Sequence, residues 1–380
     1  MKNLFLFILL LISPRLFAQE LQITPYGFIK ASVTGADHAL ASFSNINLSA
    51  PTLAIARTRA IDENSRSSFQ VAQSRFGATI TKSEKVSGRF ELDFIDFGKS
   101  SPTTQMVPRV RRALVTYKGE GFHLDIGQDW DLFSPTTAYT YDIVGLYFNA
   151  GNTGFQRQQL QYHRNLSAWQ LSAALGMAGN NPGTADADLE IANSPTYSIR
   201  AKHTAGNWIY GYSGIYSRIN FATSNDRWTE AYGNNLFFER ETPSFGIKAE
   251  LFQGQNLANI GALSLARATA THDVREWGGF VSMQVPVNEN NKIFGGVGCD
   301  RIDNKGSIAA ANISATGVVN NNATGARTNF LSRIGLDHQI EKDFSWLIEL
   351  SRYETSSKLS ASSYQTYITH ALETGILWKF

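Results

Sequence analysis

Two sets of charged residues in this sequence could act together across a water-filled space. Three arginines fall on the polar positions of stretches in which polar and apolar residues alternate: Arg75, Arg112 and Arg157. Three acids, with no lysine or arginine among them, lie in segment 129–153: Asp129, Asp131 and Asp142. Guanidinium groups that face carboxylates create an electric field, which orients dipolar solutes and favours small polar molecules. This pattern predicts an electrostatic filter.

The histidines offer a second kind of chemistry, either nucleophilic or metal-assisted. Five of them lie in alternating stretches or turns: His123, His163, His203, His338 and His370. No serine-rich signature accompanies them, and neither H-x-x-x-H nor C-x-x-C spacing occurs. Cys299 is the single cysteine, so no internal disulfide forms. We therefore predict no metal, no cofactor and no enzymatic activity, with a membrane-barrel hydrolase as an alternative.

The elements that must position these side chains have a two-residue period, which is that of β-strands. No segment after the start of the chain holds ~18 continuous apolar residues, so no transmembrane helix is predicted. The alternation predicts sixteen strands, of which 229–239 is the weakest, near residues 22–34, 69–81, 86–96, 108–118, 121–128, 154–163, 167–177, 196–204, 207–218, 229–239, 243–253, 273–286, 291–302, 327–340, 343–354 and 366–380.

The connections between these strands alternate between long and short. The long ones cover residues 35–68, 97–107, 129–153, 178–195, 254–272 and 303–326, and the tight ones cover 82–85, 119–120, 164–166, 205–206, 240–242, 287–290 and 341–342. One end of the molecule then carries the long loops and the other the short turns, which is typical of outer-membrane barrels. An even number of strands places both termini on the short-turn, periplasmic side. We predict an all-β, transmembrane antiparallel barrel, with a β-sandwich or a propeller as the soluble alternative.

The start and the composition of the chain agree with export to an outer membrane of the Gram-negative type. Residues 1–18 combine a basic start, a short apolar run and a small-residue cleavage site, which predicts a signal peptide followed by a barrel of residues 19–380. Aromatic residues make up 12% of the chain and charged residues 17%. The net charge of +2 is too small to indicate a nucleic-acid partner.

A barrel of about sixteen strands leaves an aqueous channel unless a segment folds into it. The predicted filler is the third long loop, 129–153, because its aromatic content is too high for a loop surrounded by water. Strand pairing through the tight turns sets Arg75 and Arg112 level on one wall, with Arg157 about two residues lower and Arg89 nearby. The alternative is that these arginines pair with neighbouring acids and only fill the lumen.

The balance of inward charge predicts a mild preference for anions. By strand parity, nine bases point inward: Lys30, Arg75, Arg89, Arg112, Arg157, Arg200, Lys202, Lys248 and Arg333. Six acids share that parity: Glu91, Asp93, Glu250, Asp337, Glu349 and Glu373. Arg109 and Arg111 are predicted to lie at the mouth.

Aromatic residues near strand ends predict the interfacial girdles of a membrane barrel: Tyr26, Tyr117, Trp208, Trp228, Trp277 and Trp378. The last stretch, 366–380, alternates strictly and stops on an apolar face with Trp378 and Phe380. This ending resembles the closing strand of bacterial outer-membrane barrels. The resemblance implies that Trp378 and Phe380 serve as an assembly signal for the barrel-assembly machinery.

Three stretches, Arg112 to Val115, Leu124 to Pro135 and Gly154 to Tyr162, resemble the DcaP-like family of outer-membrane porins. The opening Tyr26 to Ala31 is also similar, and beyond about residue 165 the likeness is architectural. Membership would imply a homotrimer of sixteen-stranded channels for small acids such as dicarboxylates, with a third loop folded inside. A plugged receptor lacks a visible plug domain, and an adhesin or purely structural barrel remains an alternative.

Overall fold

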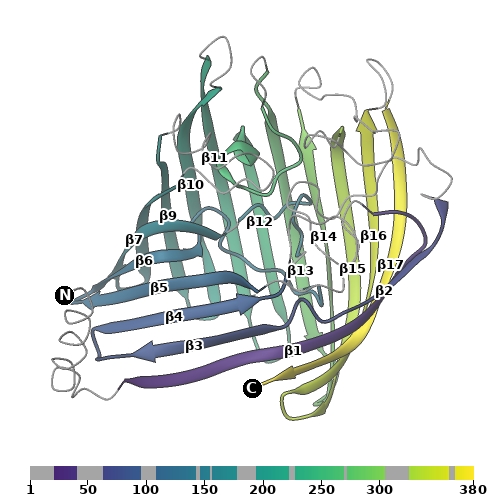
Figure 1. Cartoon of the computed structure of the whole chain (residues 1–380), viewed down its shortest axis with the longest axis horizontal. Helices are drawn as coiled ribbons and strands as arrows, with labels where there is room; N and C mark the ends of the chain where they lie inside the picture. Colours follow the sequence, from purple (N-terminus) through teal and green to yellow (C-terminus); the bar gives the residue numbers. More distant parts are fainter. Residues whose placement is uncertain are drawn as a thin grey trace, which may run out of the picture.

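The computed structural model describes residues 21–40, 63–95, 108–142, 146–154, 156–177, 194–221, 227–268, 272–303, 325–358 and 364–380. They form a single sheet of seventeen strand segments (Figure 1): β1 (Gln22–Ala36), β2 (Arg66–Gln70), β3 (Arg75–Thr81), β4 (Val86–Asp93), β5 (Arg109–Gly119), β6 (Phe122–Trp130), β7 (Gln156–Leu166), β8 (Trp169–Gly176), β9 (Thr196–Ala205), β10 (Trp208–Phe221), β11 (Arg227–Glu241), β12 (Gly246–Gln255), β13 (Arg275–Pro286), β14 (Asn291–Ile302), β15 (Ala326–Glu341), β16 (Phe344–Lys358) and β17 (Tyr364–Lys379). The predicted leader, residues 1–18, lies outside the described residues.

The sheet is a closed, antiparallel barrel of sixteen strands, because β2 and β3 are two pieces of one barrel strand. Both pieces pair with β1, Gln70 opposite Ser32 and Arg75 opposite Phe28, so one extra residue is accommodated between them. The other strands pair with their sequence neighbours, and β1 pairs with β17 to close the cylinder. The predicted fold class and strand number are therefore confirmed.

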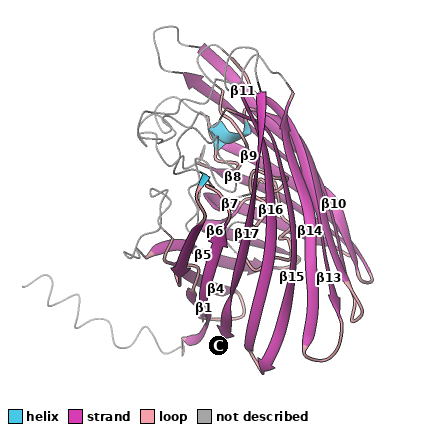
Figure 2. Ribbon diagram, turned by 90° about the vertical axis from the view of Figure 1, so that its right-hand side faces the viewer, coloured by secondary structure: helices cyan, strands magenta, loops and turns pink. Residues whose placement is uncertain are grey.

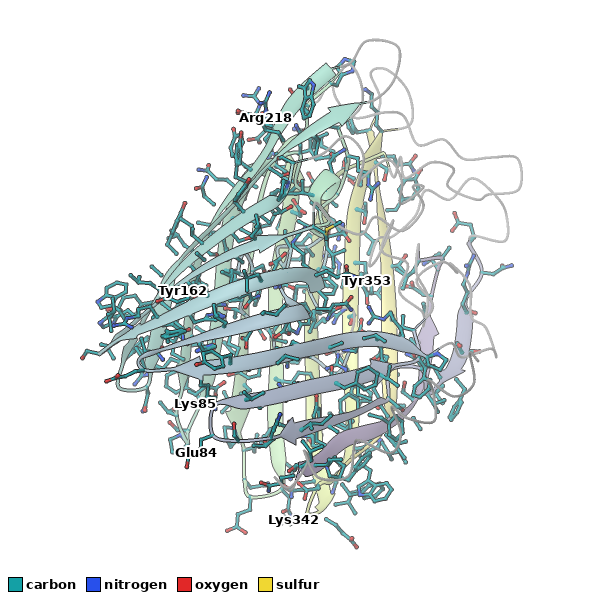
Figure 3. The ribbon with its side chains drawn as sticks, turned by 60° about the vertical axis from the view of Figure 1, so that its left-hand side comes forward. Glu84, Lys85, Tyr162, Arg218, Lys342 and Tyr353 are labelled. Atoms are coloured by element: carbon teal, nitrogen blue, oxygen red, sulfur yellow. The ribbon has the colours of Figure 1, made fainter. Side chains whose placement is uncertain are left out.

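Tight turns and longer connections lie at opposite ends of the barrel, as the loop lengths predict. In Figure 3, Glu84 and Lys85 of the β3–β4 turn and Lys342 of the β15–β16 turn lie at the lower end, whereas Arg218 of β10 lies near the upper one. The β5–β6 turn contains Gly121 at a φ of 72°. Positive φ suits the tight turns that match the twist of two neighbouring strands.

The two faces of the barrel wall have the reverse polarity of a soluble sheet. On β16, Leu350 on the outer face is 50% exposed, whereas the neighbouring Glu349 on the inner face is 2% exposed. The other strands follow the same rule, with valine, leucine and isoleucine outside and serine, asparagine and charged residues buried inside. Among the described residues, no helix is long and apolar enough to cross a membrane.

Most of the predicted girdle aromatics lie on the outer face near strand ends. Trp208, Trp228, Trp277 and Trp378 are all more than one-third exposed. Tyr26 is an exception and corrects the prediction. Its hydroxyl donates a hydrogen bond to Glu91 Oε2 at 3.2 Å and accepts one from Arg89 at 2.9 Å, so the ring lies inside the barrel.

The seam of the barrel is where the two ends of the chain meet. The Gly27 and Phe380 backbones exchange two hydrogen bonds of 3.1 Å. The Phe380 ring lies over Gly27 and contacts the ring of Phe76, with 5.8 Å between the two centroids. A side chain at position 27 would collide with this arrangement, because a Cβ there would lie 2.8 Å from the Phe380 ring and closer still to the Arg75 carbonyl oxygen.

We expect Gly27→Ala to weaken the seam by about 1–3 kcal/mol, the usual cost of overpacking a filled site. Gly35→Ala is the matched control, because it lies on the same strand and a Cβ there has its nearest neighbour at 3.8 Å. The measurement is the temperature at which the folded barrel loses its distinct mobility in a detergent gel. Equal unfolding temperatures for the two variants would contradict the assigned contact.

Candidate functional site

The segment 131–154, which follows β6, lies against the polar inner faces of strands on the opposite side of the barrel. Its backbone donates to wall side chains at three points: Thr136 N to Glu250 Oε1 at 2.7 Å, Tyr139 N to Ser282 Oγ at 2.8 Å and Tyr141 N to Glu349 Oε2 at 2.8 Å. The Ser134 hydroxyl also donates to Glu250. A buried loop without regular structure needs such partners for its backbone N–H and C=O groups. Side chains of β12, β13 and β16 supply the hydrogen bonds that a helix or sheet would otherwise provide.

Aromatic packing and close backbone contact hold the second half of this segment. The ring of Tyr147 stacks on Phe280 of β13, with a centroid distance of 5.6 Å. Gly151 has a φ of 104°, and a Cβ on it would collide with the Gly279 backbone of β13. A Cβ on Gly298 of β14 would likewise collide with the Ala150 carbonyl oxygen. Glycine is needed at both contacts because the loop backbone lies directly on the sheet.

Each of the three predicted acids pairs with a different arginine of the wall. Asp129 contacts Arg112 at 2.6 Å, Asp131 contacts Arg157 at 3.5 Å and Asp142 contacts Arg333 at 3.1 Å. Burial raises the pKa of the Asp131 carboxyl, and the Arg157 guanidinium and the Phe133 N–H oppose that rise. Asp129 belongs to β6 and lies beside Arg112 of β5, so this pair joins neighbouring strands and does not face the arginine across the lumen as predicted. Asp142 uses Arg333 of β15, which was counted among the inward bases but was not predicted as its partner.

Arg157 is enclosed rather than directed at an open channel. Only 5% of the residue is exposed, and its guanidinium donates to the carbonyl oxygens of Met177 and Ile260, each at 2.7 Å, as well as to Asp131. An arginine with this many backbone partners fixes the segments it touches. For Arg157 the geometry therefore matches the alternative, in which a wall arginine pairs with a neighbouring acid and fills the lumen.

The remaining predicted arginines belong to a charged network on β3, β4 and β5. Arg111 contacts Glu91 at 2.8 Å and Asp93 at 3.3 Å, and Arg109 also binds Asp93. The interaction partners of Arg75 include Glu91 and Asp93. Arg109 and Arg111, predicted at the mouth, therefore lie in the wall network itself.

A β-bulge sets the facing of these two arginines. Glu91 pairs with Arg112, but the next residue, Leu92, pairs with Val110, so Arg111 is the extra residue. An extra residue reverses the facing of everything beyond it on that strand. Arg109 and Arg111 consequently point inward and Val110 points outward, where it is 41% exposed.

The register also corrects the predicted heights. Gly77 pairs with Glu91, and Glu91 pairs with Arg112, so Arg112 lies two residues along the sheet from Arg75. Gln128 pairs with both Ala113 and Gln158, so Arg112 and Arg157 lie on one row. The prediction had Arg75 and Arg112 level and Arg157 lower. It was wrong because the register assumed across the turns and loops differs from the observed pairing, including the extra residue at Arg111.

Two features that hold the 131–154 segment were not predicted. One is the connection between β12 and β13, which contains the short helical turn η2 (Leu257–Ile260), drawn in cyan in Figure 2. It packs against the segment, and Leu263 N donates to Thr153 O at 2.9 Å. The available sequence signal was a series of apolar residues in an otherwise polar connection: Leu257, Ile260, Leu263 and Leu265.

The other feature is Lys30, which was predicted only to face inward. It is 1% exposed, and its ammonium group contacts Glu373 at 2.9 Å and donates to the Tyr141 carbonyl oxygen at 2.7 Å. Gln73 accepts a further bond at 2.6 Å. Lys30 therefore ties β1 and β17 to the segment, a role that no local pattern reveals.

A polar cavity of about 290 Å³ remains between this segment and the wall formed by β5 to β9. Arg112, Asp129 and Arg200 line it together with His123, Asp125 and His163. The cavity holds charged groups of both signs, which suits a passage for small polar solutes rather than a site for an apolar ligand.

A closed antiparallel barrel of sixteen strands with an exposed apolar outer face is the fold of the outer-membrane porins. The structure of the outer membrane channel DcaP of Acinetobacter baumannii matches it with a TM-score of 0.71 and 13% identity, over 96% of this chain and 98% of that one. The anion-selective porin from Comamonas acidovorans matches with a TM-score of 0.60 and 12% identity, over 95% and 100% of the two chains.

OmpT of Vibrio cholerae, in its trimer form, matches with a TM-score of 0.56 and 11% identity, over 95% of this chain and 99% of that one. At these identities the likeness is one of fold. No model of a known protein family matches the sequence, and no curated protein does.

Proposed function

We propose that this chain is an outer-membrane porin, a channel for the passive diffusion of small polar and preferentially anionic solutes. The observation that carries the proposal is the reversed polarity of the closed barrel, with apolar side chains exposed outside and charged side chains buried inside. Closure leaves no unpaired strand edge, which is the condition for a sheet to lie in hydrocarbon. The DcaP-like fold supports the same assignment.

The proposed membrane placement follows from the two ends of the barrel. Residues 1–18 would be removed on export, the short turns and both termini would face the periplasm, and the longer connections would face outward. Trp378 and Phe380 would serve as the signal for the barrel-assembly machinery. Both are 50% exposed on the outer face, where a binding partner could reach them before the barrel enters the membrane.

The proposed narrowing of the channel is made by residues 129–153. Its support is the set of wall contacts at Glu250, Ser282 and Glu349, together with the ion pairs of the two loop acids Asp131 and Asp142. A segment held on two sides of the lumen reduces the free cross-section and separates the basic wall of β3 to β5 from the glutamates of β12 and β16.

The proposed preference for anions rests on the distribution of charge rather than on its sum. The inner faces of β3, β4 and β5 carry five arginines: Arg75, Arg89, Arg109, Arg111 and Arg112. On the same three strands the only carboxylates are Glu91 and Asp93. A local excess of guanidinium groups raises the concentration of anions beside it. Across the lumen, Glu250 and Glu349 are occupied by the loop backbone.

Planar-bilayer conductance of the purified full chain tests the proposal. We expect ohmic current steps in groups of three, since the fold is shared with a protein whose structure is a trimer. Single isolated steps would contradict the homotrimer, and a silent but folded protein would favour an adhesin, a structural barrel or a hydrolase. Liposome swelling with a small dicarboxylate, and with neutral and cationic solutes of matched size, would then rank the solutes.

A further inference from the structure

Three side chains with metal-binding chemistry converge on the inner wall near the short-turn end of the barrel. His123 and Asp125 share the inner face of β6, and His163 lies directly opposite His123 on β7. Asp125 Oδ2 lies 3.8 Å from His123 Nε2 and 3.6 Å from His163 Nε2. The three ligand atoms all lie within 4.8 Å of one another.

Neighbouring strands orient Asp125 and His163, whereas the His123 ring stacks on His163, with 4.2 Å between centroids and 12° between the ring planes. Thr116 of β5 donates a hydrogen bond of 2.5 Å to Asp125 Oδ1, which leaves Oδ2 directed at the histidines. Ser172 of β8 lies 2.8 Å from His163 Nδ1, and its hydroxyl can accept from Nδ1–H in the tautomer that a metal bound at Nε2 requires. Such supporting bonds typically orient the ligands of metal sites.

A fourth oxygen faces the same point. Gln161 Oε1 lies 3.0 Å from His163 Nε2, while its amide nitrogen donates to the Trp130 carbonyl oxygen at 2.7 Å. That donation fixes the amide so that its oxygen is turned towards the histidine. Without a metal, His163 Nε2–H can donate to Gln161 Oε1; when a cation replaces that proton, the lone pairs of His163, Gln161 and Asp125 face it together.

The spacing suits a first-row transition metal. Four ligand atoms at ~2.0–2.1 Å from a tetrahedral ion lie roughly 3.3–3.5 Å from each other. The two measured distances to Asp125 Oδ2 are close to that range. For its Nε2 to reach the same ion, the His123 ring must turn out of its stack on His163, and at 26% exposure this side chain has room to turn.

The surroundings select the kind of ion. The cluster opens into the polar cavity, so an ion can reach it from water, but Arg200 lines the same cavity. An arginine disfavours a cation held by charge alone, so the affinity must come from the imidazole nitrogens. Imidazole prefers zinc, copper and nickel over calcium or magnesium.

We propose that His123, Asp125 and His163, with Gln161 as a possible fourth ligand, bind one Zn²⁺ ion on the inner wall of the barrel. Strand spacing conceals such a site in the sequence, because two of its ligands face each other across a strand pair that is linked by a long connection.

The test is a titration of the purified, detergent-folded full chain with Co²⁺, whose visible absorption reports ligand geometry, followed by displacement with Zn²⁺. We expect one Co²⁺ per chain, lost on addition of an equivalent of Zn²⁺. His123→Ala and Asp125→Asn should each weaken binding by at least ~10-fold. Asparagine can still accept the Thr116 bond, so this variant is expected to fold. His338→Ala is the matched control, since His338 bonds to Asn291 outside the cluster.

Two results would overturn the site: no Co²⁺ absorption in the folded wild type, or equal affinity in the wild type and the two ligand variants. A second readout rests on the proposed porin function. Micromolar Zn²⁺ should lower the conductance of the wild type but not that of Asp125→Asn. Because the absorption measurement needs no current, failure of the channel assignment and failure of the metal site would be told apart.

Discussion

Replacing Glu250 and Glu349 together with alanine should raise the single-channel conductance, because the 131–142 segment would lose its hold on the far wall. Glu250 accepts bonds from Ser134 and from Thr136 N, and Glu349 accepts bonds from Thr140 and from Tyr141 N. Hydrogen bonds to charged groups contribute about 1.5–3 kcal/mol each. Each 1.4 kcal/mol lost changes the ratio of docked to undocked loops about tenfold.

The control for this double variant is Glu354→Ala. Glu354 is also a carboxylate of β16, but it forms an ion pair with Arg352 at 2.7 Å and, within the described residues, does not bond to the loop. Its replacement should leave the current unchanged. If the double variant folds and conducts like the wild type, the loop does not limit the flow.

Replacing Arg75, Arg111 and Arg112 with alanine should shift the reversal potential in a salt gradient towards cation selectivity. At ~8 Å and an effective dielectric constant of ~40, one removed charge changes the energy of a passing ion by about 1 kcal/mol, roughly a fivefold change in its local concentration. Loss of Arg112 also removes the guanidinium that lies 2.6 Å from the Asp129 carboxylate, so an uncompensated negative charge adds to the shift towards cations.

Arg240 provides the matched control for selectivity. Its guanidinium lies over the Trp208 ring, at 4.3 Å from the centroid, and Trp208 is on the outer face. Arg240→Ala should therefore leave the reversal potential unchanged. An equal reversal potential in the triple variant and the wild type would reject the basic wall as the filter while leaving the barrel intact.

Arg157 should behave differently from the other wall arginines. Its removal leaves Asp131 buried without its charge partner, and breaking a buried pair in this way costs about 3–5 kcal/mol. We therefore expect Arg157→Ala to lower the unfolding temperature and loosen the loop, with a smaller direct effect on ion selectivity. A variant as stable as the wild type would contradict this role.

The strands could be predicted because their signal is local. A membrane-barrel strand alternates residue by residue, so even the weakest predicted one, 229–239, is present as β11 (Arg227–Glu241). The charged pairing of the loop could also be predicted in kind, because an acidic, aromatic segment without basic residues needs basic partners. The strands that supply those partners could not be predicted. Arg333 and Glu349 are distant in sequence from the loop, and their contacts with it depend on the path of the loop across the lumen.

Two kinds of error arose from geometry that alternation does not record. The bulge at Arg111 adds one residue to β5 and turns Arg109 inward, so both arginines join the wall network that the sequence had not assigned them to. The register of each strand pair decides which arginines share a row, and it places Arg112 level with Arg157 rather than with Arg75. Both depend on hydrogen-bond register, which a single sequence specifies only weakly.

The meeting of Gly27 with Phe380 has a consequence for how the molecule is made. The partners of the first strand are the second barrel strand and the last strand, so the cylinder cannot shut until the end of the chain has emerged. Joining such distant ends is slow, because the entropy of a very long loop is lost before any contact compensates for it. Throughout synthesis and export the apolar outer surface would stay exposed to water. The nascent protein would therefore depend on chaperones that keep it from aggregating.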